Sequence, residues 1–209
     1  MERGLEKVEL NFGQVLFESG SKPGHVYFPN DCLISLLLVI DGGALEVGLV
    51  GKEGMAGVAV ALGHAESPVR ALVQGTGSAM RMTTARFAQE LKHNGDLQRE
   101  VDRCVYAALT TAMQVAACNN AHLLEERLAR WLLMVRDRVA RDDFFLTQEF
   151  LARMLGVRRA GVTEAASALQ RRDLIRYSRG RIRIIEPRKL RAAAFSCYKV
   201  IRKLENGET

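Results

Sequence analysis

The chain has 209 residues and a mass of 23.2 kDa, enough for one large domain or two small ones. Apolar residues make up 48% of it and charged residues 26%, which excludes a disordered or collagenous chain. The longest apolar run, Leu33 to Ile40, is far shorter than the roughly 20 residues of a membrane-spanning helix. The first residues are polar and acidic, unlike a signal peptide, so we expect a cytoplasmic protein without membrane contact.

Positive charge is concentrated in the second half of the chain. Residues 1–121 carry 10 Lys and Arg against 13 Asp and Glu, a net charge of −3, whereas residues 122–209 carry 20 against 11, a net charge of +9. Of those 20 cations 17 are arginine, whose planar fork pairs with phosphate oxygens and with the guanine edge. The second half is therefore predicted to be a separate unit with nucleic acid as its leading partner, although a solvated arginine-rich surface would have the same composition.

The segment from Val8 to Met82 alternates short apolar stretches with turn residues, which is typical of antiparallel β structure. The sequence Asp41-Gly42-Gly43 indicates a hairpin turn, and the small residues between Gly54 and Leu62 indicate a short helix. We expect a β-sandwich or barrel lobe. The predicted strands are Gln14–Phe17, His25–Pro29, Leu33–Ile40, Leu45–Leu49, Arg70–Val73 and Gly77–Met82.

From Thr84 onward the apolar residues recur at helical spacing. The pattern predicts a short helix over Thr84 to Lys92 and a much longer one from a cap at Asp96 to about Asn119. One stripe of the long helix must be buried, either against its own β lobe or, as we expect, against the same helix of a second copy. The predicted dimer-interface residues are Leu97, Val101, Val105, Ala108, Ala112 and Val115.

A further helix is predicted from His122 to Val139. Its leucines and the only tryptophan, Trp131, should face inward as core residues. Four arginines should face outward: Arg127, Arg130, Arg136 and Arg138.

The segment from Leu146 to Leu169 has the pattern of a helix-turn-helix. Thr147 caps a first helix, Gly156 supplies the positive φ that ends it, and Val157 fills the turn. The inward stripe of the second helix is Val162, Ala165 and Leu169. Its outward residues at the N-terminal end are Arg158, Arg159, Ala160, Thr163 and Glu164, where a recognition helix meets base edges.

A basic hairpin with Gly180 at its turn follows, over Ile175 to Ile185. Helix-turn-helix spacing, an arginine cluster and a basic wing coincide within a short stretch, and together they predict DNA binding. A helical hairpin without a ligand is the plainer alternative.

These features resemble the cyclic-AMP receptor and fumarate-nitrate regulator (Crp/Fnr) family of bacterial transcription factors. Further landmarks of the resemblance are Tyr27-Phe28-Pro29, the Gly51-x-Glu53-Gly54 stretch and Arg127-Leu-Ala-Arg-Trp-Leu-Leu133. It implies an α+β protein with an antiparallel β-roll effector domain over residues 1–94, a long dimerisation helix over 95–120 and a winged helix-turn-helix over 121–209. It also implies a homodimer that binds a near-palindromic site on double-stranded DNA and acts through RNA polymerase.

The resemblance assigns roles to particular residues. Arg159 falls on the family's base-contacting arginine and is suited to a bidentate bond with guanine, while Thr163 and Glu164 are further base-contact candidates, Glu164 as an acceptor from cytosine N4. The next family position, usually glutamate, is Ala160, so we expect a different operator. The phosphate-contact candidates are Thr147, Gln148, Arg158, Arg179, Arg181 and Arg183.

The effector lobe departs from the cyclic-AMP-binding members. Those members use a Gly-Glu-Leu stretch and an Arg-Ser or Arg-Thr pair, whereas this chain has Gly57-Val58-Ala59 and a Pro-Val-Arg stretch ending at Arg70. Gly57, Val58 and Arg70 remain effector-pocket candidates, but we do not expect cyclic AMP to bind there. An unknown small-molecule effector stays open.

The sequence predicts no cofactor and no metal site. Its four cysteines are too far apart for a CxxC pair, an iron-sulfur cluster would need more than Cys32 in the N-terminal half, and the histidines show no ligand spacing, although His25 or His64 could ligate haem. No nucleophile, base and acid stand together, so we expect no enzyme.

Two other functions are weighed. In one the winged lobe binds a protein instead of DNA; in the other the β lobe is a cupin-like metal enzyme, for which the ligand cluster is missing.

Overall fold

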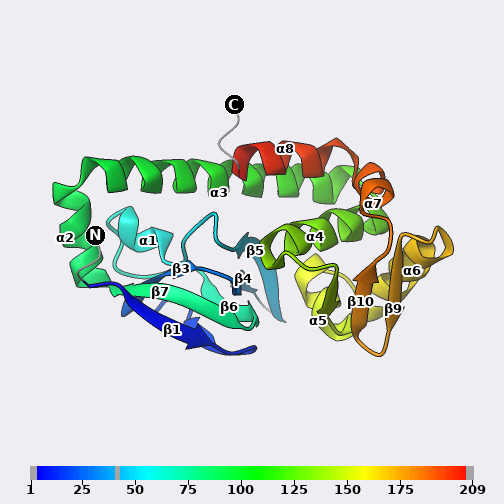
Figure 1. The fold of residues 1–209 in the computed structure, drawn as a ribbon, viewed down its shortest axis with the longest axis horizontal. Coiled ribbons are helices and arrows are strands. Elements are labelled where there is room, and N and C mark those ends of the chain that lie inside the picture. Colours follow the sequence, from blue (N-terminus) through cyan, green and yellow to red (C-terminus); the bar gives the residue numbers. More distant parts are fainter. Residues whose placement is uncertain (1–3, 41–42, 206–209) are drawn as a thin grey trace.

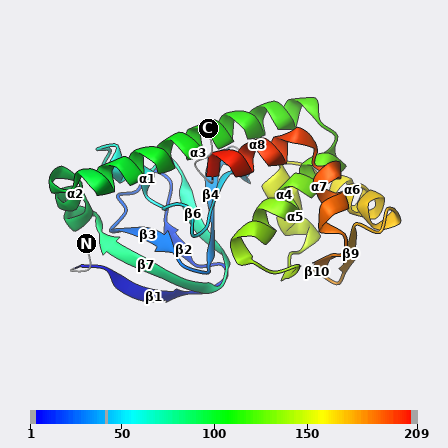
Figure 2. The same ribbon diagram turned by 45° about the horizontal axis from the view of Figure 1, so that its top comes forward.

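A computed structural model of the chain describes residues 4–40 and 43–205. A β lobe lies at one end and a helical lobe with a small sheet at the other, and α3 (Gly95–Ala121) runs along both (Figure 1). Figure 2 shows α8 (Phe195–Glu205) beside the second half of α3. The predicted fold class, a β-roll followed by a long helix and a winged helix-turn-helix, is confirmed.

The β lobe consists of two antiparallel sheets. Their strand orders are β1-β7-β3 and β2-β6-β4-β5. Each predicted strand is present, two of them with the predicted bounds. Strand β1 was not predicted, because charged residues alternate along it with only a few apolar ones. Asp41 and Gly42 of the predicted turn lie outside the described residues, although β4 and β5 pair as a hairpin. The strands are β1 (Glu6–Leu10), β2 (Val15–Phe17), β3 (His25–Pro29), β4 (Leu33–Ile40), β5 (Gly43–Val50), β6 (Arg70–Gly75) and β7 (Gly77–Thr83).

Three helices follow the order expected for the first half of the chain: α1 (Val58–Ala61), α2 (Thr84–His93) and α3. The hydroxyl of Thr83 caps α2 by accepting from the backbone N–H of Arg86. The cap of α3 is Asn94, whose Oδ1 accepts from the N–H of Leu97 at 3.1 Å, and the predicted cap Asp96 lies inside the helix.

The apolar stripe predicted for a dimer interface faces the chain's own core. Leu97 and Val101 are only 8% and 4% exposed, because they pack with Met55 and Phe87 of the β lobe. Val105 packs against the same cluster, and Val115 packs against the core of the C-terminal lobe. The first two residues are therefore core residues, which corrects their assignment to a dimer interface. Ala108 and Ala112 remain exposed.

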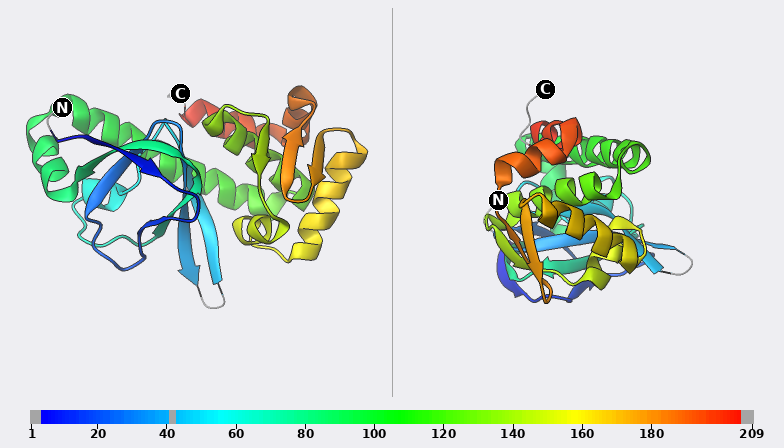
Figure 3. Two further views of the ribbon diagram at one scale, coloured as in Figure 1. Left: turned by 60° about the horizontal axis from the view of Figure 1, so that its bottom comes forward. Right: turned by 90° about the vertical axis from the view of Figure 1, so that its right-hand side faces the viewer.

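The C-terminal lobe is a winged helix extended by two helices (Figure 3). Its sheet has the order β8-β10-β9, so β8 adds a strand that the polar stretch around Asp142 concealed. The last two helices were also not predicted. The elements are α4 (Leu124–Val139), β8 (Asp143–Phe145), α5 (Gln148–Leu155), α6 (Arg159–Arg171), β9 (Ile175–Ser178), β10 (Arg181–Ile184), α7 (Pro187–Ala193) and α8.

Helix α4 is buried on nearly every side, and two of its arginines are not outward as predicted. Arg130 and Arg138 are 3% and 6% exposed. Arg138 lies between two carboxylates, with Nε 2.8 Å from Glu53 and Nη2 2.6 Å from Glu205, and it donates to the carbonyl of Met134. A buried guanidinium needs such partners because isolated burial of a charge is costly. Arg138 thereby joins the β lobe, α4 and α8.

A second polar contact joins the lobes. The indole Nε1 of Trp131 donates to Glu46 Oε1 at 2.6 Å, and the hydroxyl of Ser35 donates to Glu46 Oε2 at 2.7 Å. Trp131 is core, as predicted, but it also has this hydrogen-bonding role. Burial raises the pKa of the Glu46 carboxyl to about 7, although these two donors and the nearby Arg138 and Arg130 oppose the shift.

No helix in the described ranges is long and apolar enough to cross a bilayer.

The raised pKa of Glu46 predicts a pH-dependent stability. The carboxyl of Glu46 binds its proton more tightly in the folded state than in the unfolded state. The folded state therefore loses stability as pH rises from the ordinary carboxyl range to about 7 and this proton is removed. The free energy of unfolding of the parent chain should therefore fall between pH 5 and 8, relative to Glu46→Gln, by roughly 1 to 3 kcal/mol. Urea unfolding at several pH values measures this difference. The exposed Glu100→Gln is the control, and parallel profiles for the parent and Glu46→Gln would contradict the prediction.

Candidate nucleic-acid interface

The helix-turn-helix is formed by α5 and α6, with the local chemistry that the sequence predicted. Thr147 caps α5, since its Oγ1 accepts from the N–H of Phe150 at 3.1 Å. Gly156 ends the helix at a φ of 64°, and the N–H of Val157 donates to the carbonyl of Ala152 at 2.9 Å.

Gly156 is also a point of close approach between the lobes. A Cβ at this position would lie 2.6 Å from Leu45 Cδ1 of β5. Both its positive φ and this contact therefore favour glycine, and the turn of the helix-turn-helix rests on the β4–β5 hairpin.

Helix α6 has one buried face and one exposed face. Val162, Ala165 and Leu169 are buried as predicted. The outward residues Arg158, Arg159, Ala160, Thr163 and Glu164 are all exposed. Helix α6 belongs to the lobe opposite α2 (Figure 3). Its leading end is exposed but lies beside the β4–β5 hairpin, since Arg158 and Arg159 border a cavity together with Ile40 and Leu45.

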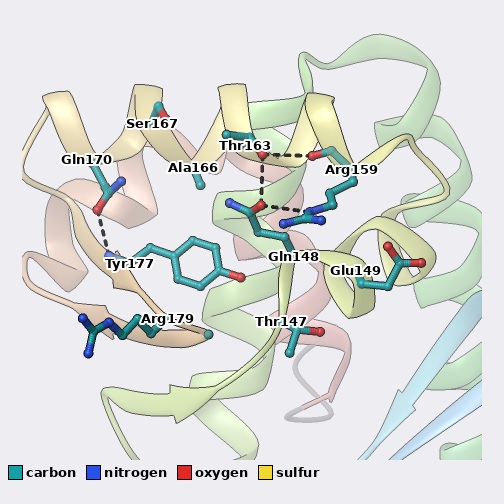
Figure 4. Close-up of a pocket in the computed structure, with 11 residues that line it drawn as sticks. Thr147, Gln148, Glu149, Arg159, Thr163, Ala166, Ser167, Gln170, Tyr177 and Arg179 are labelled. Carbon is teal, nitrogen blue, oxygen red and sulfur yellow. Dashed lines mark hydrogen bonds between the residues drawn. The ribbon is translucent and has the colours of Figure 1, made fainter.

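Gln148 brings the exposed residues of the two helices together. Its Oε1 accepts from Arg159 Nε at 3.3 Å and from Thr163 Oγ1 at 3.1 Å (Figure 4). The three side chains border a concavity of about 540 Å³ between α5, α6 and the wing. Arg159, a predicted base contact, is therefore held next to Gln148, a predicted phosphate contact.

The wing is a tight hairpin between β9 and β10. Arg179 and Gly180 at its turn have φ values of 50° and 80°, as a primed turn requires. A Cβ on Gly180 would lie 2.8 Å from the ring of Phe145, so the turn also packs against β8.

The wing arginines differ in their surroundings. Arg181 and Arg183 lie 3.3 and 2.9 Å from the carboxylate of Asp143 on β8, so part of their charge is neutralised within the chain. Arg179 at the tip lines the concavity and has no ion pair among the described residues. Arg179 is therefore a wing cation available to a polyanion, as is the exposed Arg176 on β9.

Tyr177 is a residue of this site that the sequence did not single out. Its hydroxyl donates to the carbonyl of Leu146 at 2.7 Å, and its N–H donates to Gln170 Oε1 at 2.8 Å. These bonds fix the wing to α6 and to the segment before α5. Ser167 and Gln170 also line the concavity, and their positions four and seven residues after Thr163 on one helical face could have indicated them.

The expected effector residues do not all meet. Gly57 and Val58 line a groove of about 800 Å³ in the β lobe, together with His64 and the buried Ser67. Arg70 does not line this groove, because its Nε pairs with Glu18 Oε2 at 2.6 Å outside it. None of the described residues that line the groove is lysine or arginine. Arg70 is therefore engaged beside the groove and does not line it, and its role in an effector pocket stays a prediction.

Comparison with known proteins agrees with this architecture. Residues 126–193 match the family model described as a Crp-like helix-turn-helix domain. No curated protein sequence matches the chain.

Three solved structures illustrate the likeness of the fold. A CRP/FNR-family transcriptional regulator of Thermus thermophilus has a TM-score of 0.75 and 22% identity, over 90% of this chain and 98% of that one. FixK2 of Bradyrhizobium japonicum has a TM-score of 0.75 and 13% identity, over 89% and 95%. The c-di-GMP-responsive regulator CLP of Xanthomonas campestris has a TM-score of 0.71 and 13% identity, over 87% and 94%.

The geometry and the comparisons together define a DNA-binding transcription regulator. Residues 126–193 form a Crp-like helix-turn-helix domain, and the chain has the fold of solved Crp/Fnr regulators throughout. The family resemblance predicted from the sequence is thereby confirmed.

Changing Arg159 or Arg179 to alanine is expected to weaken DNA binding in two different ways. Arg159→Ala should lower discrimination at one base pair by about 1 to 3 kcal/mol, because a bidentate guanine contact is lost. Arg179→Ala should weaken binding to every sequence alike and reduce the slope of log affinity against log salt by about 1, because it removes a phosphate contact. Fluorescence anisotropy with operator, single-site-variant and random duplexes at several salt concentrations separates the two. Equal losses on all duplexes for both variants would refute the assigned roles.

Proposed function

We propose that this regulator acts as a homodimer that binds a near-palindromic operator and controls transcription through RNA polymerase. The observation that carries the proposal is the exposed leading end of α6, which presents Arg158, Arg159 and Thr163 beside a basic wing. In a dimer, two such ends about 34 Å apart would enter successive major grooves on one side of the duplex.

The exposed residues of α6 suggest how bases are distinguished. Arg159 is suited to the O6 and N7 acceptors of guanine, and Glu164, one turn further along the exposed face, is suited to the amino donor of cytosine. Ala160 offers only an apolar contact, for which a thymine methyl is the natural partner. The operator should therefore differ from that of relatives with glutamate at this position.

The phosphate contacts come from the edges of the concavity. Thr147 uses its oxygen to accept the cap bond, so its hydroxyl hydrogen is free to be donated to a phosphate. Gln148 can donate through its amide nitrogen while its oxygen holds Arg159 and Thr163. Arg158 and the wing arginines Arg179, Arg181 and Arg183 add charge on either side, which favours tight but salt-dependent binding.

Dimerisation is best supported by the outer face of α3, opposite the predicted stripe. Tyr106, Leu109 and Met113 are 56%, 54% and 61% exposed and recur at steps of three and four, so they form one apolar stripe on the exposed side of α3. Such a stripe on a long helix suits antiparallel or parallel packing against its own copy.

The groove in the β lobe supports a regulator that does not use cyclic AMP. A cyclic phosphate needs a cationic partner, and the described lining of the groove offers none, whereas Arg70 is committed to Glu18. If a small molecule binds there, uncharged apolar chemistry fits the leucine, valine and alanine side chains that line it. No cofactor is required by the proposed function.

The alternative in which the winged lobe binds a protein makes a different prediction. Capture of a protein partner should depend weakly on salt, whereas operator binding should weaken steeply. Selection of bound duplexes from a random DNA pool, followed by gel shift at two ionic strengths, tests the proposal directly. Enrichment of an inverted repeat supports it, and no enrichment with salt-insensitive binding would reject it.

A charge within the apolar stripe of α3 should abolish the dimer. Leu109→Glu buries a carboxylate in the proposed interface, so sedimentation equilibrium should change from about twice the 23.2 kDa chain mass to a single chain. Leu62→Glu is the matched control, since Leu62 is 56% exposed and lies on the β lobe. A dimer that survives Leu109→Glu would exclude this face.

A further inference from the structure

Two thiols and an imidazole meet where the DNA-binding lobe joins the long helix. Cys118 lies in the last turn of α3, His122 follows one turn later as the residue that ends α3, and Cys197 comes from α8. Their Sγ and ring nitrogen atoms all lie within 4.8 Å of one another. Cys197 Sγ and His122 Nε2 are 3.3 Å apart.

The imidazole is held in the orientation found for metal-bound histidine. Glu126 Oε2 lies 3.1 Å from His122 Nδ1, and the same oxygen accepts from the N–H of Leu123 at 3.0 Å. A carboxylate on Nδ1 fixes that nitrogen as the donor and leaves the Nε2 lone pair directed at the sulfurs. The ring of Phe195 covers the imidazole with the ring centroids 5.1 Å apart. His122 thus has a carboxylate on one nitrogen and thiols on the other.

The two sulfurs are buried, and a buried cation lies near them. Cys118 and Cys197 are 2% and 4% exposed, while the His122 side chain is 21% exposed and leaves a path from solvent. Arg130, only 3% exposed, has a buried Nε without a hydrogen-bond partner and forms no ion pair with any carboxylate in the described chain. Burial raises the pKa of the Cys118 thiol, and the nearby Arg130 opposes that shift. A thiolate at Cys118 would give this guanidinium the negative neighbour it lacks.

We propose that Cys118, His122 and Cys197 bind a zinc-like divalent metal ion at the joint of α3, α4 and α8. Mixed thiolate and imidazole ligands are those that Zn²⁺ prefers. With Zn–S near 2.3 Å and Zn–N near 2.0 Å, tetrahedral ligand atoms lie about 3.5 to 3.8 Å apart. Cys197 Sγ and His122 Nε2, at 3.3 Å, already have nearly this spacing, and the other pairs, which lie within 4.8 Å, need to approach by at most about 1 Å. The fourth position is left to a water molecule. The amide Nε2 of Gln114 donates to Cys197 Sγ at 3.3 Å, so Gln114 would hydrogen-bond the thiolate ligand.

The site would connect elements that carry the recognition helix. Cys197 lies on the last helix, Cys118 lies in the last turn of α3 and His122 lies in the α3–α4 connection. A bound ion would therefore cross-link Cys118 and Cys197, which are 79 residues apart in sequence. Such a cross-link would fix α8 across the joint. The inference goes beyond DNA binding and does not depend on it.

Cobalt spectroscopy of the reduced full-length chain tests the proposal. After treatment with a chelator and its removal, titration with Co²⁺ without oxygen should give one equivalent of binding, a thiolate-to-cobalt charge-transfer band and tetrahedral visible bands. One equivalent of Zn²⁺ should abolish both signals. Saturating Zn²⁺ at about a hundredfold excess over Kd should raise the melting temperature by roughly 5 to 10 °C.

Matched variants assign the signal to the three residues. Cys118→Ser and Cys197→Ser should each weaken the charge-transfer band and lower affinity at least tenfold, whereas Cys104→Ser on the same helix should leave both unchanged. Glu126→Gln keeps an acceptor for the Leu123 N–H and should lower affinity about 10- to 100-fold with the band retained. His122→Gln serves where a cysteine variant fails to fold, as judged by circular dichroism.

Three results would overturn the proposal. They are the absence of a charge-transfer band at saturating Co²⁺, an undiminished band in Cys118→Ser and Cys197→Ser, and mass-spectrometric recovery of a Cys118–Cys197 disulfide from a chain that still binds Co²⁺ with unchanged affinity.

Discussion

The rest of this structure depends on the polar contact between the β4–β5 hairpin and helix α4. Trp131 and Arg138 are buried on α4, and each reaches across to a carboxylate of the β lobe, Glu46 or Glu53. Leu33 and Leu37 of β4 belong to the same apolar cluster as α4, so the core is continuous from one lobe to the other. Because a buried charge must find its partner, these contacts define one relative position of the lobes much more sharply than apolar packing alone. The turn of the helix-turn-helix lies against the same hairpin through Gly156 and Leu45, and its position follows from that arrangement.

The sequence predicts best those features that depend on neighbouring residues. Thr147 as a cap, Gly156 at positive φ and the buried stripe of α6 were all predictable, because caps, turns and helical periodicity are local. The long helix shows the limit of this reasoning. Its periodicity identified a buried face, but periodicity does not say what buries it, and Leu97 and Val101 turned out to pack within their own chain. The stripe at Tyr106, Leu109 and Met113 was the less apolar one and was overlooked.

The remaining wrong predictions have one cause: a charged side chain was taken to be an exposed and unpaired one. Arg130 and Arg138 fit an outward position on α4 by type, yet both are buried. Arg130 lies against the end of α3 at Asn119, and Arg138 lies against α8 at Glu205, a helix absent from the prediction. The candidate DNA site shows the same effect on a smaller scale. Arg181 and Arg183 have the spacing of a basic wing, but β8 places Asp143 between them and so reduces the charge that they offer. Only the pairing of distant strands could reveal this, and no local pattern encodes it.

Helix α8 connects residues outside the helix-turn-helix to the position of the recognition helix. Besides the Arg138–Glu205 pair, Tyr198 donates to Asp137 at 2.5 Å and Arg202 lies 3.3 Å from the same carboxylate, so α8 is fastened to α4 along its length. Cys197 of the same helix contacts His122 at the end of α3. In a dimer built on α3, the separation of the two recognition helices depends on the angle between α3 and α4. A helix that contacts both would hold that angle, and a ligand, proton or metal ion that altered its contacts would act on DNA binding without touching α6.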